Sequence, residues 1–78
     1  EAPIQLSFDG DAWVEVRDRS GKKVFSQLGR KGATEAVAGQ APFSLVVGNA
    51  AKVRLSYHGK PVDLHPHIKI NVARFNLE

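Results

Sequence analysis

The sequence predicts an all-β domain, a small antiparallel β-sandwich of about seven strands in an immunoglobulin-like or Greek-key arrangement. Apolar and polar residues alternate along most of the chain, which is the pattern of strands with one face on a core. Turn-forming residues recur at intervals of about 8 to 12 residues, a spacing typical of sandwiches and barrels. A length of 78 residues gives one domain, residues 1–78, with a small and almost wholly apolar core.

Two strands and a hairpin turn are predicted at the N-terminal end. Residues 4–8 alternate and end at a turn over residues 9–11. In the next strand, Val14 and Val16 point toward the core. The same alternation sends three side chains to the opposite face of this strand: Trp13, Glu15 and Arg17. A hairpin turn follows, with residues 20–21 at its tip.

The middle of the chain predicts three more strands. The first returns from the hairpin and ends near Gly29, with alternate residues on one face: Val24, Ser26 and Leu28. Residues 34–39 form a short strand before a turn at residues 39–42. The third strand directs three apolar residues toward the core: Phe43, Leu45 and Val47. It ends at a bend of Gly48 and Asn49, which tolerate positive φ.

The C-terminal third predicts the remaining strands. The clearest alternation places three residues on the core: Val53, Leu55 and Tyr57. Pro61 lacks the N–H that a central strand donates, so residues 60–64 are expected to lie at a sheet edge or to pair only briefly. Residues 4–8 are expected at another edge. The last stretch, residues 68–77, changes parity, which predicts a bulge near Val72 or a strand that crosses between sheets.

Composition narrows the class of protein. Eleven Lys and Arg stand against eight Asp and Glu, a net charge of +3, and the basic residues are dispersed along the chain. A solvated surface therefore explains them better than a polyanion-binding site. Cysteine is absent, which excludes disulfides and thiol chemistry, and no apolar run is long enough to cross a membrane. Methionine is absent too, and we expect the chain to be cut from a longer precursor.

No catalytic, metal or cofactor site is predicted. Asp63, His65 and His67 stand two residues apart and could present metal ligands on one face. We favour a turn-ordering aspartate and two exposed histidines. Asp9 and Asp11 lack the further oxygen ligands of a calcium loop. The serines have no positioned base, and the glycines do not have the spacing of a phosphate-binding loop.

The aromatic residues argue against nucleic-acid binding. Four of the six occupy alternating apolar positions that the core requires: Phe8, Phe43, Tyr57 and Phe75. Trp13 and Phe25 remain, and two aromatic rings make a poor platform for stacking bases.

Trp13 has two interpretations. We favour a packed indole that covers a corner of the small sandwich beneath a loop. The alternative is a partner-binding hot spot with Glu15 and Arg17, because Trp and Arg contribute disproportionately to interface energies. Lys52 and Arg54, on another exposed strand face, form a second candidate partner-binding set.

Four segments together resemble the C-terminal periplasmic domain of the RodZ family of bacterial cell-shape proteins. They cover almost the entire chain: LSFDGDAWVEVRDRSGKKVF, PFSLVVGNA, GKPVDL and VARFNL. The resemblance implies a small β-sandwich at the end of a bitopic inner-membrane protein. In that family, a cytoplasmic helix-turn-helix part that this chain does not include links the actin-like MreB filament to the membrane.

The resulting prediction is a non-enzymatic interaction module in the periplasm. The resemblance brings no catalytic residues, and it implies that the parent protein helps maintain rod shape by linking the MreB cytoskeleton to the cell-wall elongation machinery. The expected partners are the periplasmic parts of cell-elongation proteins. The alternative is direct binding of an anionic or glycan ligand, such as peptidoglycan, through the basic surface.

Overall fold

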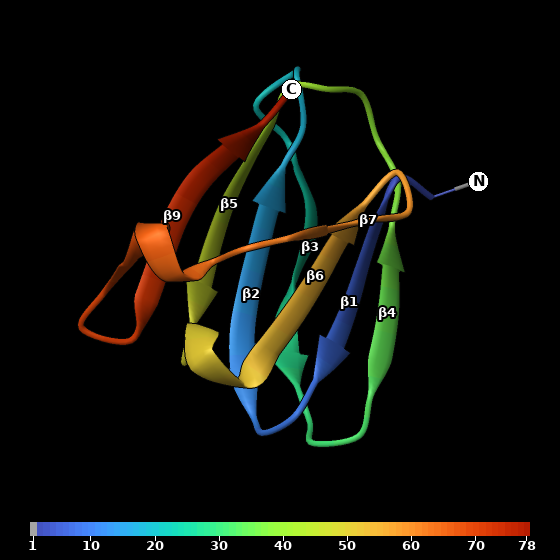
Figure 1. The fold of residues 1–78 in the computed structure, drawn as a ribbon. Coiled ribbons are helices and arrows are strands. Elements are labelled where there is room, and N and C mark those ends of the chain that lie inside the picture. The colour runs from blue at the N-terminus through green and yellow to red at the C-terminus, as the bar shows by residue number, and fades with distance from the viewer. Residues whose placement is uncertain (1) are drawn as a thin grey trace.

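The computed structural model describes residues 2–78, and within them two antiparallel sheets pack against each other (Figure 1). One sheet has four strands in the order β4-β1-β6-β7, and the other has five in the order β3-β2-β5-β9-β8. The strands are β1 (Ile4–Phe8), β2 (Ala12–Arg17), β3 (Lys23–Gly29), β4 (Thr34–Val37), β5 (Phe43–Gly48), β6 (Val53–Tyr57), β7 (Lys60–Val62), β8 (Ile68–Lys69) and β9 (Val72–Leu77). Two short 3-10 helices complete the chain, η1 (Ala50–Lys52) and η2 (His65–His67).

The predicted antiparallel sandwich is confirmed. It has more strands than the expected seven because two of them are very short: β7 has three residues and β8 has two. Of residues 60–64, expected at a sheet edge because of Pro61, the first three form the edge strand β7, and residues 63 and 64 lie outside it. Across the described part of the chain, no helix is long and apolar enough to span a membrane.

Strand alternation builds the core from both sheets. In the four-stranded sheet, β1 buries every second residue: Ile4, Leu6 and Phe8. In the five-stranded sheet, β2 and β5 do the same with Val14, Val16, Leu45 and Val47. All buried side chains of residues 2–78 are apolar, so burial carries no cost for unpaired polar groups. Each large one contributes roughly 1.5–3 kcal/mol relative to an exposed position.

Strand β1 is not the edge strand that we expected. It lies between β4 and β6, with Ile4 opposite Val37 on one side and Tyr57 on the other. The prediction was wrong because the short strand β4 pairs with β1 across a long sequence separation. Such a pairing leaves no signal within residues 4–8 themselves.

Strand β3 directs the opposite set of side chains toward the core from the set that we predicted. A bulge shifts its register, so that Val16 pairs with Phe25 while Arg17 pairs with Lys23. Phe25 therefore faces inward and packs, half-buried, against the core. Leu28 pairs with Trp13 and points outward. The prediction that put Phe25 off the core and grouped Val24 with Leu28 was wrong because Val24 is the extra residue of the bulge.

The change of parity at the C-terminal end is caused by a hairpin. Lys69 pairs with Val72, and the two residues between them, Ile70 and Asn71, form the turn of the β8–β9 hairpin. Neither a bulge near Val72 nor a strand crossing between sheets occurs there. A two-residue turn reverses the chain and so restarts the alternation on β9.

Candidate functional site

The two outward sheet faces differ in chemistry. The outward side of the four-stranded sheet carries small or polar residues on β1 and β4: Gln5, Ser7, Thr34 and Ala36. The outward side of the five-stranded sheet is the face that bears the tryptophan, and we call it the Trp13 face. The strand register gives its residues: Trp13, Glu15, Arg17, Lys23, Ser26, Leu28, Ser44, Val46, Gly48, Lys69, Val72, Arg74 and Asn76.

An apolar row crosses the Trp13 face. Trp13 lies opposite Leu28, and these side chains are 44% and 45% exposed. On the other side of Trp13 lies Gly48, where an added Cβ would be 3.7 Å from the Trp13 Cβ. Gly48 pairs with the half-buried Val72. The expectation that a loop would bury Trp13 was wrong: the indole lies on an open sheet surface, next to a residue without a side chain.

The Trp13 face is also strongly basic. It holds one acidic residue, Glu15, and four basic residues: Arg17, Lys23, Lys69 and Arg74. Its formal charge of +3 equals that of the entire chain, so the charges of all other residues cancel. The only acid of the face is already paired, because Lys23 Nζ lies 3.3 Å from Glu15 Oε1. The register of five strands thus gathers the charge excess that is dispersed in the sequence.

The β2–β3 hairpin positions Arg17 at one end of this face. Arg17 Nη1 donates a hydrogen bond to the Gly21 carbonyl at 2.9 Å. The Asp18 carboxylate accepts hydrogen bonds from the Ser20 hydroxyl at 2.6 Å and from the Ser20 N–H at 3.0 Å. Both bonds stabilise the charged carboxylate and so lower the pKa of Asp18 below its usual value, and the bond from the Ser20 hydroxyl has the larger effect. Arg17 therefore supports the turn as well as facing outward.

Lys52 and Arg54, the second predicted set, lie away from the Trp13 face. Arg54 is exposed on β6 of the four-stranded sheet, and its Nε lies 2.9 Å from Asp9 Oδ2. Lys52 belongs to η1, with its stem against Gly10, where an added Cβ would lie 3.0 Å from Lys52 Cγ. Both side chains thus have local structural contacts. The structure brings Trp13, Glu15 and Arg17 together and does not join Lys52 and Arg54 to them.

Several residues of the Trp13 face were not predicted as site residues from the sequence. Leu28 lies on β3 and Val46 on β5, the two strands that pair with β2, and Arg74 lies on β9, which pairs with β5. A signal for Arg74 was present, because it alternates with the inward-facing Ala73 and Phe75. Its place on the same face as Trp13 depends on the β5–β9 pairing, which sequence alternation does not reveal.

The histidine-rich segment does not assemble a metal site. His65 Nδ1 lies 2.9 Å from Asp63 Oδ1, and the His65 N–H donates to the same oxygen at 3.0 Å. Both contacts lower the pKa of Asp63, and the contact with the His65 ring has the larger effect. The His67 ring instead stacks on Phe75, with centroids 5.0 Å apart. Residues 2–78 contain no group of three His, Cys, Asp or Glu side chains that could hold a metal ion.

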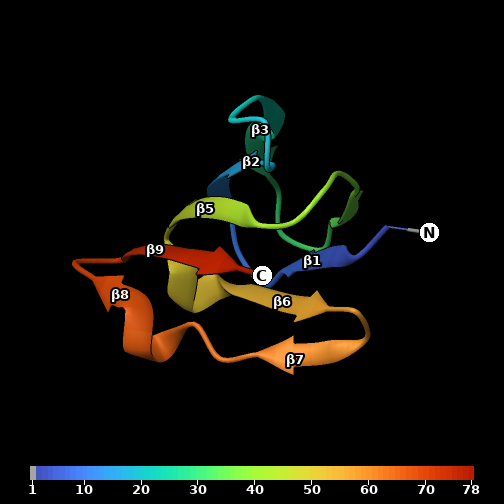
Figure 2. The ribbon, with the colours of Figure 1, turned by 90° about the horizontal axis from the view of Figure 1, so that it is seen from above.

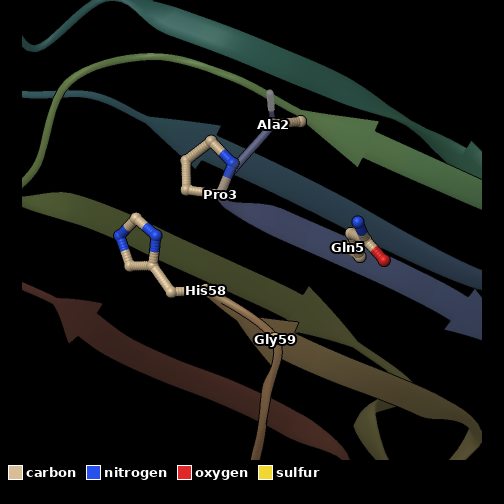
Figure 3. Close-up of a pocket in the computed structure, with 5 residues that line it drawn as sticks. All are labelled: Ala2, Pro3, Gln5, His58 and Gly59. Atoms are coloured by element: carbon tan, nitrogen blue, oxygen red, sulfur yellow. The ribbon is translucent and has the colours of Figure 1, made fainter.

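An open depression at the N-terminal end offers little chemistry. It has a volume of about 320 Å³ and is lined by Ala2, Pro3, Gln5, His58 and Gly59 (Figure 3). The His58 N–H donates to the Pro3 carbonyl at 2.8 Å, which ties the β6–β7 turn to the start of β1. His58 is the one ionisable side chain of this lining. Catalysis needs a nucleophile or a second acid–base group beside it, and the lining supplies neither.

Comparison with known families agrees with the earlier resemblance. The chain matches the family described as the RodZ C-terminal domain over residues 5–76, nearly its full length. No solved structure matches the chain. The match spans all but the first residue of β1 and the last residue of β9, and therefore both sheets and the Trp13 face. The chain thus belongs to the RodZ C-terminal domain family, a structural and interaction family with a role in cell shape.

Proposed function

We propose that this chain is a non-enzymatic interaction module that acts in the periplasm. It is the terminal domain of a bitopic inner-membrane protein that helps maintain rod shape, with MreB bound on the cytoplasmic side by a separate part. The domain engages the periplasmic parts of cell-elongation proteins. Family membership supports the role in cell shape, and the Trp13 face supports binding rather than catalysis.

One observation carries the proposal: an exposed tryptophan lies beside an exposed leucine on the sheet face that holds the net charge of the chain. Interfaces concentrate their binding energy in a few Trp, Tyr and Arg residues near the centre, with polar groups around them. On this face, Trp13 and Leu28 lie side by side near one end of strands β2 and β3. Val46 lies opposite Arg74, and Arg17 lies at the other end of β2. This arrangement is typical of a protein-binding surface.

The proposal is tested by photo-cross-linking in intact cells that express the full-length parent protein. A cross-linking residue at Leu28 probes the Trp13 face, and one at Gln5 probes the outward face of the other sheet. We expect cell-elongation proteins to be captured from position 28 and not from position 5. Equal capture from both positions would show that the Trp13 face has no special role.

Peptidoglycan is the competing ligand, and the clustering of positive charge favours it as the second candidate. The salt dependence of binding distinguishes the two ligands. Affinity for an anionic polymer falls steeply with ionic strength, whereas an interface with a packed apolar centre responds less. The comparison therefore requires purified periplasmic domains and soluble wall fragments titrated at low and high salt.

A further inference from the structure

The β8–β9 hairpin presents an isoleucine in a backbone conformation that disfavours it. The two turn residues, Ile70 and Asn71, have φ values of 49° and 68°. A β-branched side chain rarely adopts this left-handed region. Within residues 2–78, the other non-glycine residues with positive φ are Asn or His, which tolerate it: Asn49, His58 and Asn71. Ile70 is 95% exposed, so packing inside the domain does not compensate for the conformation.

The tip of this hairpin is held in place by the rest of the fold. The Asn71 carbonyl accepts a hydrogen bond from the Ala50 N–H at 2.9 Å. Ile68, on the strand that leads into the turn, pairs with Ala73 and packs against the core. The tip itself extends beyond the sandwich, as the view from above shows (Figure 2). The fold therefore presents Ile70 at a defined position in solvent.

Ile70 lies beyond the end of the row that crosses the Trp13 face, with Lys69 between it and the apolar residues of the row. The strand register runs across the sheet from Leu28 through Trp13 and Gly48 to Val72, and then to Lys69. Ile70 follows Lys69 directly in the chain. Trp13, Leu28 and Ile70 are also the exposed large hydrophobic residues of the described chain. A partner that covers the row would thus reach the hairpin tip at its end.

Building on the proposed function, we infer that Ile70 is a second anchor of the Trp13 face and inserts into an apolar pocket of an acidic protein partner. The acidic character follows from charge complementarity with a face of formal charge +3. A second copy of this chain is disfavoured, because two such faces would repel each other. A flat bilayer is disfavoured too, since an acidic residue, Glu15, lies between Trp13 and Arg17 on the same strand.

The test replaces Ile70 with a residue that prefers the turn. Ile70→Asn removes the apolar anchor and eases the backbone, so we expect a higher thermal unfolding midpoint together with a Kd about tenfold weaker. The binding probes are purified periplasmic domains of cell-elongation proteins, assayed one at a time by calorimetry. Ile70→Leu keeps the anchor and should retain the wild-type Kd. His58→Asn, which introduces the same residue at the corresponding position of the β6–β7 hairpin, should also retain it.

Each other outcome overturns the inference. If Ile70→Asn binds normally while Trp13→Ala binds weakly, Ile70 is not an anchor and the proposed function stands. If both variants bind normally, the partner binds a surface other than the Trp13 face, and the inference fails. If the wild-type domain binds none of the probes, the proposed function fails as well. A lower unfolding midpoint for Ile70→Asn would assign Ile70 a structural role. If instead the variant loses binding to phosphatidylglycerol vesicles and not to the protein probes, the partner is a membrane.

Discussion

Trp13 and Leu28 lie directly opposite each other on neighbouring strands, and both side chains are exposed. Truncating the indole should weaken partner binding strongly and change the free energy of unfolding only slightly. For Trp13→Ala we expect a Kd at least about tenfold weaker and a change in unfolding free energy of less than about 1 kcal/mol. Calorimetry with the periplasmic probes and urea denaturation measure the two quantities.

The control for this prediction lies on the other side of the same sheet. Leu45 is buried on β5, and Leu45→Ala should cost about 2–5 kcal/mol of unfolding free energy. If Trp13→Ala were as destabilising as Leu45→Ala, the indole would belong to the fold rather than to a binding surface.

Reversing one charge of the Trp13 face should slow association. Arg74→Glu changes its formal charge from +3 to +1, so an acidic partner is attracted less, and we expect an association rate about tenfold lower at low salt. Lys60→Glu makes the same change in net charge on β7 of the other sheet. Stopped-flow measurements should find the Lys60 variant near wild type. Equal slowing of both variants would point to overall charge instead of this face.

Gly29 should tolerate no side chain, because the Phe8 ring lies against it. A Cβ at Gly29 would lie 2.3 Å from Phe8 Cζ, and Gly29 is buried at the end of β3. We expect Gly29→Ala to destabilise the domain by about 1–3 kcal/mol. A second change, Phe8→Leu, makes room, so the double variant should lose less than the two single losses combined. Simple additivity in denaturant titrations would contradict this contact.

Acid should weaken the β2–β3 hairpin through Asp18. The pKa of Asp18 is lowered in the folded chain, chiefly by the Ser20 hydroxyl, so its charged form stabilises the fold above the ordinary pKa of about 4. That contribution disappears as pH falls below this value through the folded pKa. Asp18→Asn should therefore lower the unfolding midpoint at neutral pH, and the difference from wild type should shrink as the pH falls below about 4.

Ser20→Ala provides a direct check on the cause. Without the hydroxyl donor, the pKa of Asp18 should rise toward its ordinary value, which an NMR titration of the carboxyl carbon follows. An unchanged pKa in this variant would assign the shift to other groups of the turn.

Much of the fold was predictable from local pattern. The pleat of a strand sends alternate residues to opposite faces, so Val14 and Val16 had to lie opposite Trp13 and Glu15 wherever the strand packed. Pro61 likewise indicated an edge strand through its missing N–H. These features depend on residues within one strand, which is why the sequence carries them.

The candidate site was less predictable because it is made by strand pairing. Residues from β2, β3, β5, β9 and β8 meet on one face only through their registers. The bulge at Val24 shifts the β2–β3 register by one residue, so that Leu28 rather than Gln27 lies opposite Trp13 and Phe25 faces the core. The gathering of dispersed charges has the same origin.

The sequence alone thus determined the sandwich, its apolar stripes and the family, since alternation and local motifs are properties of neighbouring residues. The tertiary structure alone decided that Trp13 is exposed, that it has Leu28 and Gly48 as neighbours and that Ile70 stands at a hairpin tip. Contacts between residues distant in the chain depend on the packing of the whole domain, and no short segment encodes them.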